Sequence, residues 1–374
     1  MKLNIGLALS ATAVAALTLT ACGSDNNAGT SATTGSATDS AASAENCGGK
    51  DSITAEGSTA QQNAIALFNQ VWGQVCAGKN LSYNPTGSGA GREQFIAKNV
   101  DFAGSDSALK DDQIAAAAAR CGDNPAWHLP LVFGPIAMAY NVEGVDGLVL
   151  NGDTLAKIFQ GQITKWNDPA IAALNSGATL PDAAITPIFR SDSSGTTDNF
   201  QKYLSAAAPQ AWTKGDGSEF QGGAGEGAQK SAGVAQAVQA TPGAIGYVEK
   251  GFADQAGLPY AQIDTGAGAV ELTDESAGKA IDAVEISGEG NDLVLDLNSL
   301  YGTQEAGAYP LVLATYNIVC SDGYDAETAA AVRSFLTVAA NDGQGGLSAA
   351  GYVPLPEKFK ERLLTSIEAI GPAA

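Results

Sequence analysis

Basic residues are scarce in this chain of 374 residues. It has 19 Lys and Arg against 40 Asp and Glu, which gives a formal net charge of −21. Binding to nucleic acid depends on clustered cations that neutralise phosphates, so this composition excludes a nucleic-acid partner. An acidic protein that binds an anion must rely on local dipoles and hydrogen bonds, because its overall field repels the ligand.

Histidines, short cysteine pairs and metal-binding spacings are also missing. His128 is the only histidine, and it lies away from any nucleophile elbow, so a Ser-His-Asp triad has no base. The cysteines contain no Cys-x-x-Cys pair of the kind that binds zinc. Asp106, Asp192 and Asp198 lack the spacing of an EF-hand. We therefore predict no catalytic residue, no metal and no cofactor.

No apolar run of this chain reaches the length of a membrane-spanning helix. The apolar run 5–19 follows Lys2 and is too short to span a membrane as a permanent helix. It ends in Leu-Thr-Ala-Cys, which resembles the lipobox of bacterial lipoprotein signals. We predict a cleaved export signal at residues 1–22, with a palmitate-type lipid anchor on Cys22. An ordinary secretory signal with an incidental cysteine is the alternative.

The segment after the signal differs in composition from the rest of the chain. Residues 23–46 are rich in Ser, Ala, Thr, Gly and Asp and contain almost no bulky apolar side chain. Such a segment cannot bury a core, so we predict a flexible tether.

An even number of remaining cysteines in an exported protein favours two disulfides, with three alternative pairings. The cysteines concerned are Cys47, Cys76, Cys121 and Cys320.

Strand-like apolar runs alternate with amphipathic runs along the remaining chain, which indicates an α/β fold. The run 168–177 is predicted to be a helix, with Asp at the N-cap, Pro at the first position and Gly at the end. Further helices are predicted at 154–160, closed by a glycine, and at 356–364. The glycine-rich stretch 215–227 is predicted to be a surface loop.

An arginine followed by a Ser/Gly loop is the most informative motif. The apolar, β-prone run 185–189 leads into Arg190, and bulky residues recur at helical spacing from Phe200. A strand, a short loop and a helix start place unpaired N–H groups and hydroxyls around a tetrahedral oxyanion. Arg190 would donate to the anion, and Asp192 would hold its guanidinium. A capped helix with a surface arginine is the alternative.

Two further loops favour the anion site. The run 56–60 (Glu-Gly-Ser-Thr-Ala) precedes a helical apolar stripe, and the glycine-rich loop 86–92 follows a strand-like segment. The second loop lacks both the context of a dinucleotide fingerprint and the Gly-Lys-Ser/Thr of a phosphate loop. A third strand-like run, 100–105, ends at Asp106. An acid beside an anion is reasonable only if the anion carries a proton.

Together these motifs resemble the substrate-binding proteins of high-affinity phosphate ABC transporters, from about residue 50 to the C-terminus. The resemblance implies a two-lobed α/β fold of the periplasmic-binding-protein type II class, with a ligand cleft between lobes joined by two crossing strands. The motifs that carry the resemblance are Gly57–Thr59, Gly87–Gly89, Asp101–Asp106, Thr154–Asn175, Arg190–Thr196 and Pro242–Glu249.

The same resemblance implies the lobes and the ligand contacts. Apolar runs 129–140 and 309–319 would cross between lobe I, residues 47–133 plus 313–374, and lobe II, residues 134–312. Ala60 would contribute only its backbone N–H, in a run that is about one helical turn longer than in shorter members of the family. Asp192 would stand behind Arg190. The implied phosphate contacts are Ser58, Thr59, Ala60, Ser88, Asp106, Arg190, Ser194, Gly195 and Thr196.

The function implied is a monomeric receptor, lipid-anchored at the extracytoplasmic face of the cell membrane. It would capture inorganic phosphate and deliver it to the permease subunits of an ABC transporter. One alternative is a binding protein for sulfate, molybdate or a phosphorylated metabolite; Asp106 argues against sulfate, which has no proton to donate. The other alternative is a phosphatase-like enzyme, which no activated nucleophile in the sequence supports.

Replacing Cys22 with Ala tests the lipid anchor. We expect C22A to move the protein from the membrane fraction to the soluble or released fraction, because cysteine lipidation is the only membrane device predicted for the mature chain. The folded domain should still bind phosphate. Cell fractionation followed by immunoblotting measures the distribution, and equal membrane retention of variant and wild type would contradict the anchor.

Overall fold

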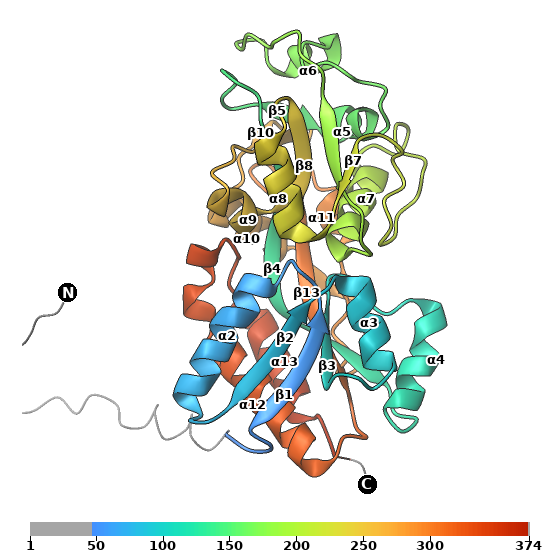
Figure 1. Cartoon of the computed structure of the whole chain (residues 1–374), viewed down its shortest axis with the longest axis vertical. Helices are drawn as coiled ribbons and strands as arrows, with labels where there is room; N and C mark the ends of the chain where they lie inside the picture. Colours follow the sequence, from blue (N-terminus) through green and yellow to red (C-terminus); the bar gives the residue numbers. More distant parts are fainter. Residues whose placement is uncertain (1–46, 373–374) are drawn as a thin grey trace, which may run out of the picture.

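The computed structural model describes residues 47–372. The predicted export signal, Cys22 and the tether lie outside this range. The described chain forms two lobes stacked along the long axis of the molecule (Figure 1). Its strands are β1 (Ser52–Gly57), β2 (Asn80–Pro85), β3 (Phe102–Ser105), β4 (Ala126–Tyr140), β5 (Val149–Asn151), β6 (Thr186–Arg190), β7 (Glu226–Ala228), β8 (Ala244–Glu249), β9 (Gln262–Asp264), β10 (Ala269–Val270), β11 (Glu285–Ile286), β12 (Leu295–Asp296) and β13 (Val312–Cys320).

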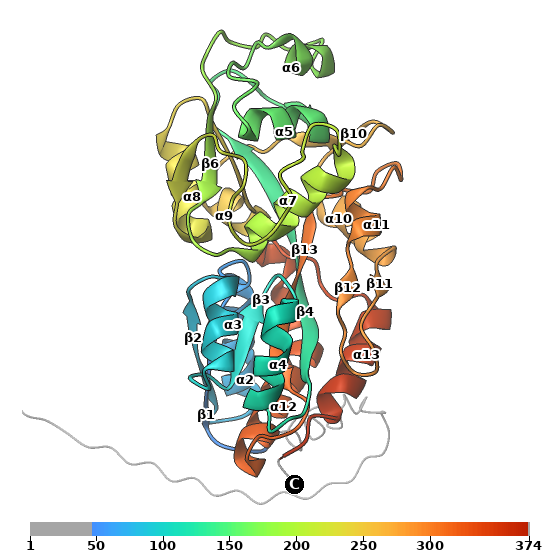
Figure 2. The same cartoon turned by 90° about the vertical axis from the view of Figure 1, so that its right-hand side faces the viewer.

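The helices cover both faces of the strands. One lobe contains α2, α3, α4, α12 and α13, and the other contains α5 to α9 (Figures 1 and 2). The helices are α2 (Gln62–Val75), α3 (Ser88–Ile96), α4 (Asp111–Arg120), α5 (Gly152–Phe159), α6 (Pro169–Leu174), α7 (Gly195–Ala207), α8 (Lys230–Ala240), α9 (Lys250–Gln255), α10 (Asp274–Asp282), α11 (Asn298–Tyr301), α12 (Ala326–Asn341) and α13 (Glu357–Glu368), with 3-10 turns at Gln344–Gly346 and Ser348–Ala350.

An eight-stranded mixed sheet in the order β2-β1-β3-β13-β4-β8-β6-β7 runs through both lobes. The long strands β4 and β13 pass from one lobe to the other (Figure 2). β4 pairs with β13 up to Pro135 and with β8 from Ile136 onward. Both strands are buried almost throughout, which explains their continuous apolar sequences. The α/β, two-lobed fold with two crossing strands is therefore confirmed.

The lobe boundaries at 133/134 and 312/313 stay a proposal. They are supported by the change of partner along β4 between Pro135 and Ile136, close to the proposed division. On the other crossing strand, β13 begins at Val312, which pairs with Pro135. A strand that leaves one set of neighbours and joins another is a natural place for one lobe to end.

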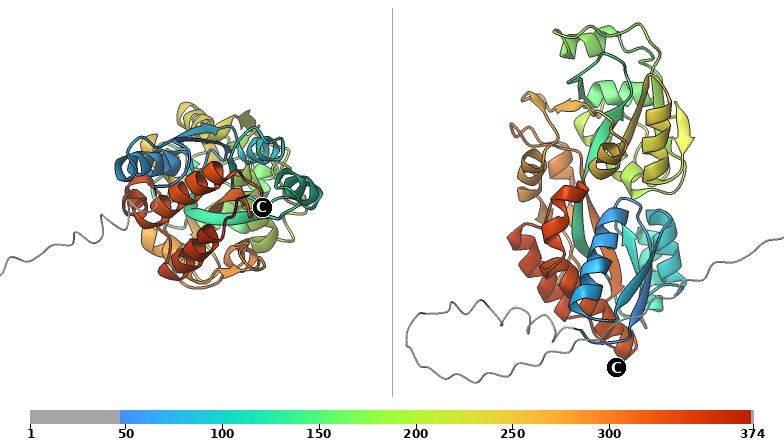
Figure 3. Two further views of the ribbon diagram at one scale, coloured as in Figure 1. Left: turned by 90° about the horizontal axis from the view of Figure 1, so that it is seen from below. Right: turned by 60° about the vertical axis from the view of Figure 1, so that its left-hand side comes forward.

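The lobe that contains residues 47 and 372 has an aromatic core. Helix α12 packs on α2, and Figure 3 shows the orange and red C-terminal helices beside the blue helix α2. Phe335 lies between Trp72 and Phe102, with ring centroids 5.4 and 5.7 Å away. Disulfides join Cys47 to Cys76 and Cys121 to Cys320, which settles the pairing that the sequence left open. Both bridges link elements of this one lobe.

The predicted helices are present, with shifted ends. Helix α6 begins at Pro169, and the Asp168 side chain accepts from the Ala170 N–H at 2.9 Å, as predicted. It ends at Leu174 rather than at Gly177, because the Asn175 side chain bonds to both backbone groups of Val149 and ties the chain to β5. In the same way α5 starts at Gly152, two residues early, and α13 extends to Glu368.

The predicted glycine-rich loop at 86–92 is a helix from Ser88 onward. Its glycines allow α3 to approach other segments closely. A Cβ on Gly91 would lie 2.5 Å from the Gly57 Cα atom, and one on Gly89 would lie 2.1 Å from the Ser193 Oγ atom. The glycine content predicted a turn here, but the glycines are needed because α3 packs closely against other segments.

Within residues 47–372, no helix is long and apolar enough to span a membrane.

A matched pair of helical glycines tests this packing constraint. We expect Gly91→Ala to lower the free energy of unfolding by about 1–3 kcal/mol, because its Cβ would collide with the backbone of Gly57 and Glu56. Gly278→Ala, in α10 with no atom within 4 Å of the new Cβ, should raise it by about 0.5–1 kcal/mol. Urea denaturation measures both values. Equal effects of the two substitutions would show that close packing of α3 does not matter.

Candidate functional site

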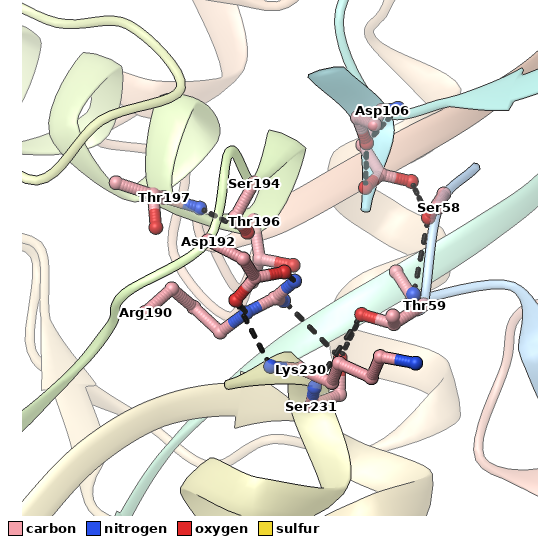
Figure 4. Close-up of polar contacts among 12 residues, drawn as sticks. Ser58, Thr59, Asp106, Arg190, Asp192, Ser194, Thr196, Thr197, Lys230 and Ser231 are labelled. Atoms are coloured by element: carbon pink, nitrogen blue, oxygen red, sulfur yellow. Dashed lines mark hydrogen bonds and ion pairs between the residues drawn. The ribbon is translucent and has the colours of Figure 1, made fainter. Parts of the chain in front are cut away.

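The predicted site residues come together where strand ends and helix starts of the two lobes meet. Figure 4 shows Ser58, Thr59 and Asp106 facing Arg190 and its neighbours across the cleft. All nine predicted contacts are buried. They follow β1 (Ser58, Thr59, Ala60), begin α3 (Ser88), follow β3 (Asp106), end β6 (Arg190) and begin α7 (Ser194, Gly195, Thr196).

Direct contacts join the two sides of this cleft. The Thr59 Oγ1 atom lies 2.7 Å from the Ser231 Oγ atom at the start of α8. A Cβ built on Gly195 would lie 2.5 Å from the Asp106 Cβ and 2.6 Å from the Ser88 Oγ. Only glycine fits at position 195 with the lobes this close.

The Asp106 carboxylate accepts hydrogen bonds from three hydroxyls. Ser58 and Thr315 donate to Oδ1 at 2.6 and 2.7 Å, and Ser88 donates to Oδ2 at 2.9 Å. An ionised carboxylate offers about four acceptor positions. One position, on Oδ2, therefore remains for a further donor.

Burial raises the pKa of Asp106 to about 6, against the hydrogen bonds from Ser58 and Thr315, which lower it. The negative charge of Glu249 adds to the increase. Among residues 47–372, no Lys or Arg lies within 4.0 Å of the Asp106 carboxylate. At neutral pH the group is mostly ionised, so it can accept but not donate a hydrogen bond.

Arg190 is buried and held by Asp192, as the sequence predicted. Its Nε and Nη2 atoms donate to Asp192 Oδ1 and Oδ2 at 2.8 and 2.5 Å. Burial alone would raise the pKa of Asp192, but the hydrogen bonds and charge of Arg190 outweigh it and lower that pKa. The backbone N–H of Lys230 also donates to Asp192 at 2.9 Å. The guanidinium keeps N–H groups on Nη1 and Nη2 that can donate to a ligand.

Helix α7 points its N-terminus into the cleft. The Ser194 Oγ atom caps the helix by accepting from the Thr197 N–H at 3.2 Å, so its own hydrogen can be donated elsewhere. The N–H groups of Gly195 and Thr196 lie in the first turn, where a helix offers them no internal partner. The 13-residue helix adds a positive dipole end at this point.

The backbone N–H of Ala60, predicted to contact the ligand, already has a partner within the protein. This N–H donates to the Ser58 Oγ atom at 3.0 Å, and the carbonyl of Ala60 accepts from the Tyr352 hydroxyl at 2.7 Å. The N–H can reach a ligand only if the first of these bonds weakens. The contact predicted for Ala60 stays a prediction.

Three polar residues in the cleft were not predicted. Thr315 is a hydroxyl within the largely apolar run of β13, and a polar residue in such a run was the available signal. Ser231 starts α8 and lies 3.4 Å from the Arg190 Nη1 atom. Glu249 ends the motif Pro242–Glu249 and accepts from Thr196 Oγ1 at 2.5 Å. Reasoning about anion binding missed Glu249 because a second carboxylate repels an anion.

Further contacts between the lobes flank the cleft. The Arg92 Nη2 atom donates to the Ser218 Oγ atom of the other lobe at 3.1 Å, while its Nη1 atom donates to the Ser105 Oγ atom of its own lobe at 2.8 Å. Ser218 is 3% exposed. The prediction of a surface loop at 215–227 is therefore wrong at Ser218, since this residue is drawn into the contact between lobes.

His128 has a packing role away from these groups. Its Nε2 atom accepts from the Leu109 N–H at 2.9 Å, and its Nδ1 atom lies 2.9 Å from an Asp292 carboxylate oxygen. In the described part of the chain, no group of three His, Cys, Asp or Glu side chains could hold a metal ion. The cleft offers many donors, one guanidinium and few acceptors, which suits a tetrahedral oxyanion that carries a proton.

Three curated relatives are similar over most of the chain. The phosphate-binding protein PstS 3 of Mycobacterium tuberculosis (strain H37Rv) is 51% identical over 374 residues, covering 99% of this chain and all of that protein. PstS 2 of the same strain is 49% identical over 369 residues, covering 98% of each chain. The phosphate-binding protein PstS of Pasteurella multocida is 34% identical over 294 residues, covering 76% of this chain and 81% of that protein.

Solved structures share the fold. A high-affinity periplasmic phosphate-binding protein, PfluDING, solved with phosphate at pH 8.5, has a TM-score of 0.68 at 24% identity, covering 84% of this chain and 93% of that one. The phosphate-binding protein from Stenotrophomonas maltophilia has a TM-score of 0.66 at 21% identity, covering 84% and 94%. The model of the PBP superfamily domain matches residues 27–342. The chain therefore belongs to the family of phosphate-binding proteins within the PBP superfamily.

Proposed function

We propose that this protein binds inorganic phosphate in the cleft between its lobes and delivers it to the permease subunits of an ABC transporter. A lipid on Cys22 would hold the receptor, as a monomer, at the extracytoplasmic face of the cell membrane. The observation that carries the proposal is Asp106, a buried acceptor at the centre of a site whose other predicted contacts are donors. Phosphate near neutral pH has both the oxygens for the donors and a proton for the acceptor.

The contacts that we assign to phosphate are the nine predicted from the sequence. The N–H groups of Gly195 and Thr196 and the guanidinium of Arg190 would bind oxygens from one side. The hydroxyls of Ser58 and Ser88 now donate to Asp106 and can turn toward the ligand when its P–OH group takes the remaining position on Oδ2. Local donors of this kind compensate the ligand charge even though the protein as a whole is acidic.

We infer that the protein is a receptor and not an enzyme. Its only histidine is held by Leu109 and Asp292 in packing contacts. Asp106, the acid among the proposed ligand contacts, is shared by three hydroxyls, and its pKa of about 6 leaves it a weak base. A carboxylate shared in this way is not a base dedicated to one hydroxyl nucleophile, as a covalent mechanism would require.

Asp106→Asn tests how the site distinguishes phosphate from sulfate. Fully ionised sulfate facing Asp106 would leave two acceptors in contact, which could cost on the order of a factor of 10⁴ in affinity. The amide of the variant can donate, so we expect the ratio of phosphate to sulfate affinity to fall. Arsenate, which has the same protonation pattern as phosphate, should bind the wild type.

Calorimetric titration with the three anions at fixed pH measures these affinities. Asp182→Asn, a surface change of the same kind, is the control and should keep the wild-type ratio. If the ratio in D106N equals that of the wild type, another group makes the distinction and the assigned site is wrong.

Arg190→Ala tests the contribution of the guanidinium. We expect phosphate affinity to fall by roughly 2–5 kcal/mol, because the substitution removes a desolvated donor and leaves Asp192 buried without its partner. Arg190→Lys should restore part of the loss, since an ammonium cannot pair with both Asp192 oxygens and still donate from the same plane. The exposed Arg362→Ala is the control. A lysine variant with wild-type affinity would show that the planar geometry is irrelevant.

A further inference from the structure

Glu249 is a buried carboxylate beside the cleft that the proposed ligand contacts do not use. It is the last residue of β8, opposite Ile136 on the crossing strand β4, and α9 starts directly after it. Its side chain is 1% exposed. An acid is rarely buried to this extent unless it is paired or has a specific task.

Only one of the two Glu249 oxygens has a hydrogen-bond partner. Oε1 accepts from Thr196 Oγ1 at 2.5 Å, whereas Oε2 is buried and, within residues 47–372, has no partner. No Lys, Arg or His in this part of the chain lies within 4.0 Å of either oxygen. Burying a carboxylate oxygen without a hydrogen-bond donor is costly, so Oε2 is a position that a further donor would satisfy.

The bond to Glu249 fixes the direction of the Thr196 hydroxyl. A hydroxyl has one hydrogen, and Thr196 gives its hydrogen to Glu249. The Oγ1 atom then offers only lone pairs to other neighbours. A bare anion oxygen placed against Oγ1 would meet an acceptor, so Thr196 can contact an anion through its side chain only if one more proton is present.

The charges around Glu249 point the same way. Its charge raises the pKa of Asp106 and of Tyr352, and it also raises the pKa of Arg190. Arg190 is already paired with a carboxylate of its own, and the adjacent Lys250 is paired with Asp254 at 2.7 Å. Within residues 47–372, Asp106 and Glu249 are thus two buried acids with no Lys or Arg within 4.0 Å. An anion that binds between them adds a third negative group, which favours protonation.

We propose that Glu249 is a second proton-accepting group of the cleft, which acts through the Thr196 hydroxyl and selects a more protonated complex. The inference rests on the proposed function and deepens it. When phosphate is bound, the complex of phosphate with Thr196 and Glu249 contains one proton more than it would need without the carboxylate, in addition to the ligand proton that Asp106 accepts.

The proton can come from either of two sources. Monobasic phosphate can donate its second hydrogen to the Oγ1 lone pair of Thr196, while the hydrogen of Thr196 stays on Glu249. With dibasic phosphate, a proton from solvent is taken up by Glu249, which then donates to Thr196 Oγ1 and frees the hydroxyl to donate to the ligand. Both routes give complexes with the same number of protons, so they have the same dependence on pH.

Glu249→Gln removes the need for that proton. The amide of the variant donates to Thr196 Oγ1, and the hydroxyl can then donate to a phosphate oxygen without any protonation. Because the wild-type complex holds an extra proton, its affinity falls relative to that of E249Q as the pH rises into the alkaline range. At a pH high enough for the free protein and the free phosphate to have lost the proton, the ratio of wild-type to variant affinity falls about tenfold per pH unit.

Calorimetry of the protein with inorganic phosphate tests this inference. Titrations in buffers with different heats of ionisation, from mildly acidic to alkaline pH, count the protons taken up on binding. We expect the wild type to take up close to one proton more than E249Q at alkaline pH. Thr196→Val removes the hydroxyl and leaves Glu249 in place, so it should give the same lower proton count as E249Q. If E249Q folds poorly, Thr196→Val still tests the proposal.

Controls separate this role from a structural one. Glu226→Gln changes an exposed acid of the same lobe and should keep the wild-type count. In the T196V background, E249Q should have no further effect on the count. The proposal would be overturned if the variants lost affinity by the same factor at every pH and took up as many protons as the wild type. The proposed binding of phosphate would still stand. A wild type that binds no phosphate would overturn the proposed function as well.

Discussion

A carboxylate buried without a cation is the constraint on which the rest of this structure depends. Asp106 can stay ionised in a dry cleft only because hydroxyls donate to it from Ser58, Ser88 and Thr315. These residues come from the end of β1, the start of α3 and the middle of β13, and 209 residues separate Thr315 from Asp106 in the sequence. The order β1-β3-β13 at the centre of the sheet is what brings them to one point.

The crossing strands give this point its second side. β4 and β13 continue from one lobe into the other, so the start of α7 and the end of β6 are presented opposite Asp106 rather than beside it. The absence of a side chain at Gly195 lets the two sides approach to contact distance. Strand connectivity, glycine position and hydroxyl placement together make a narrow polar cleft, and none of them would do so alone.

Local chemistry made several features predictable from the sequence. The Asp168 cap, the pairing of Arg190 with Asp192 and the alternation of strands and helices depend on neighbours a few residues apart. The positions of Thr315 and Glu249 in the cleft depend on sheet order and were not predicted. The helical glycines of α3 were misassigned, because Gly91 is required by a contact with β1 and Gly89 by a contact with Ser193, both distant in the sequence. Cysteine pairing was likewise left open until distant segments were placed.

The contacts that join the lobes are mostly between neutral groups. Thr59 meets Ser231 through hydroxyls, and the Gly89 N–H donates to the Ser193 carbonyl at 3.2 Å. Each such bond contributes only about 0.5–1.5 kcal/mol net, so no single contact locks the lobes together. Dissolved salt weakens attraction between exposed charges but has little effect on buried dipoles. The contacts that hold the lobes together are therefore expected to change little with salt concentration.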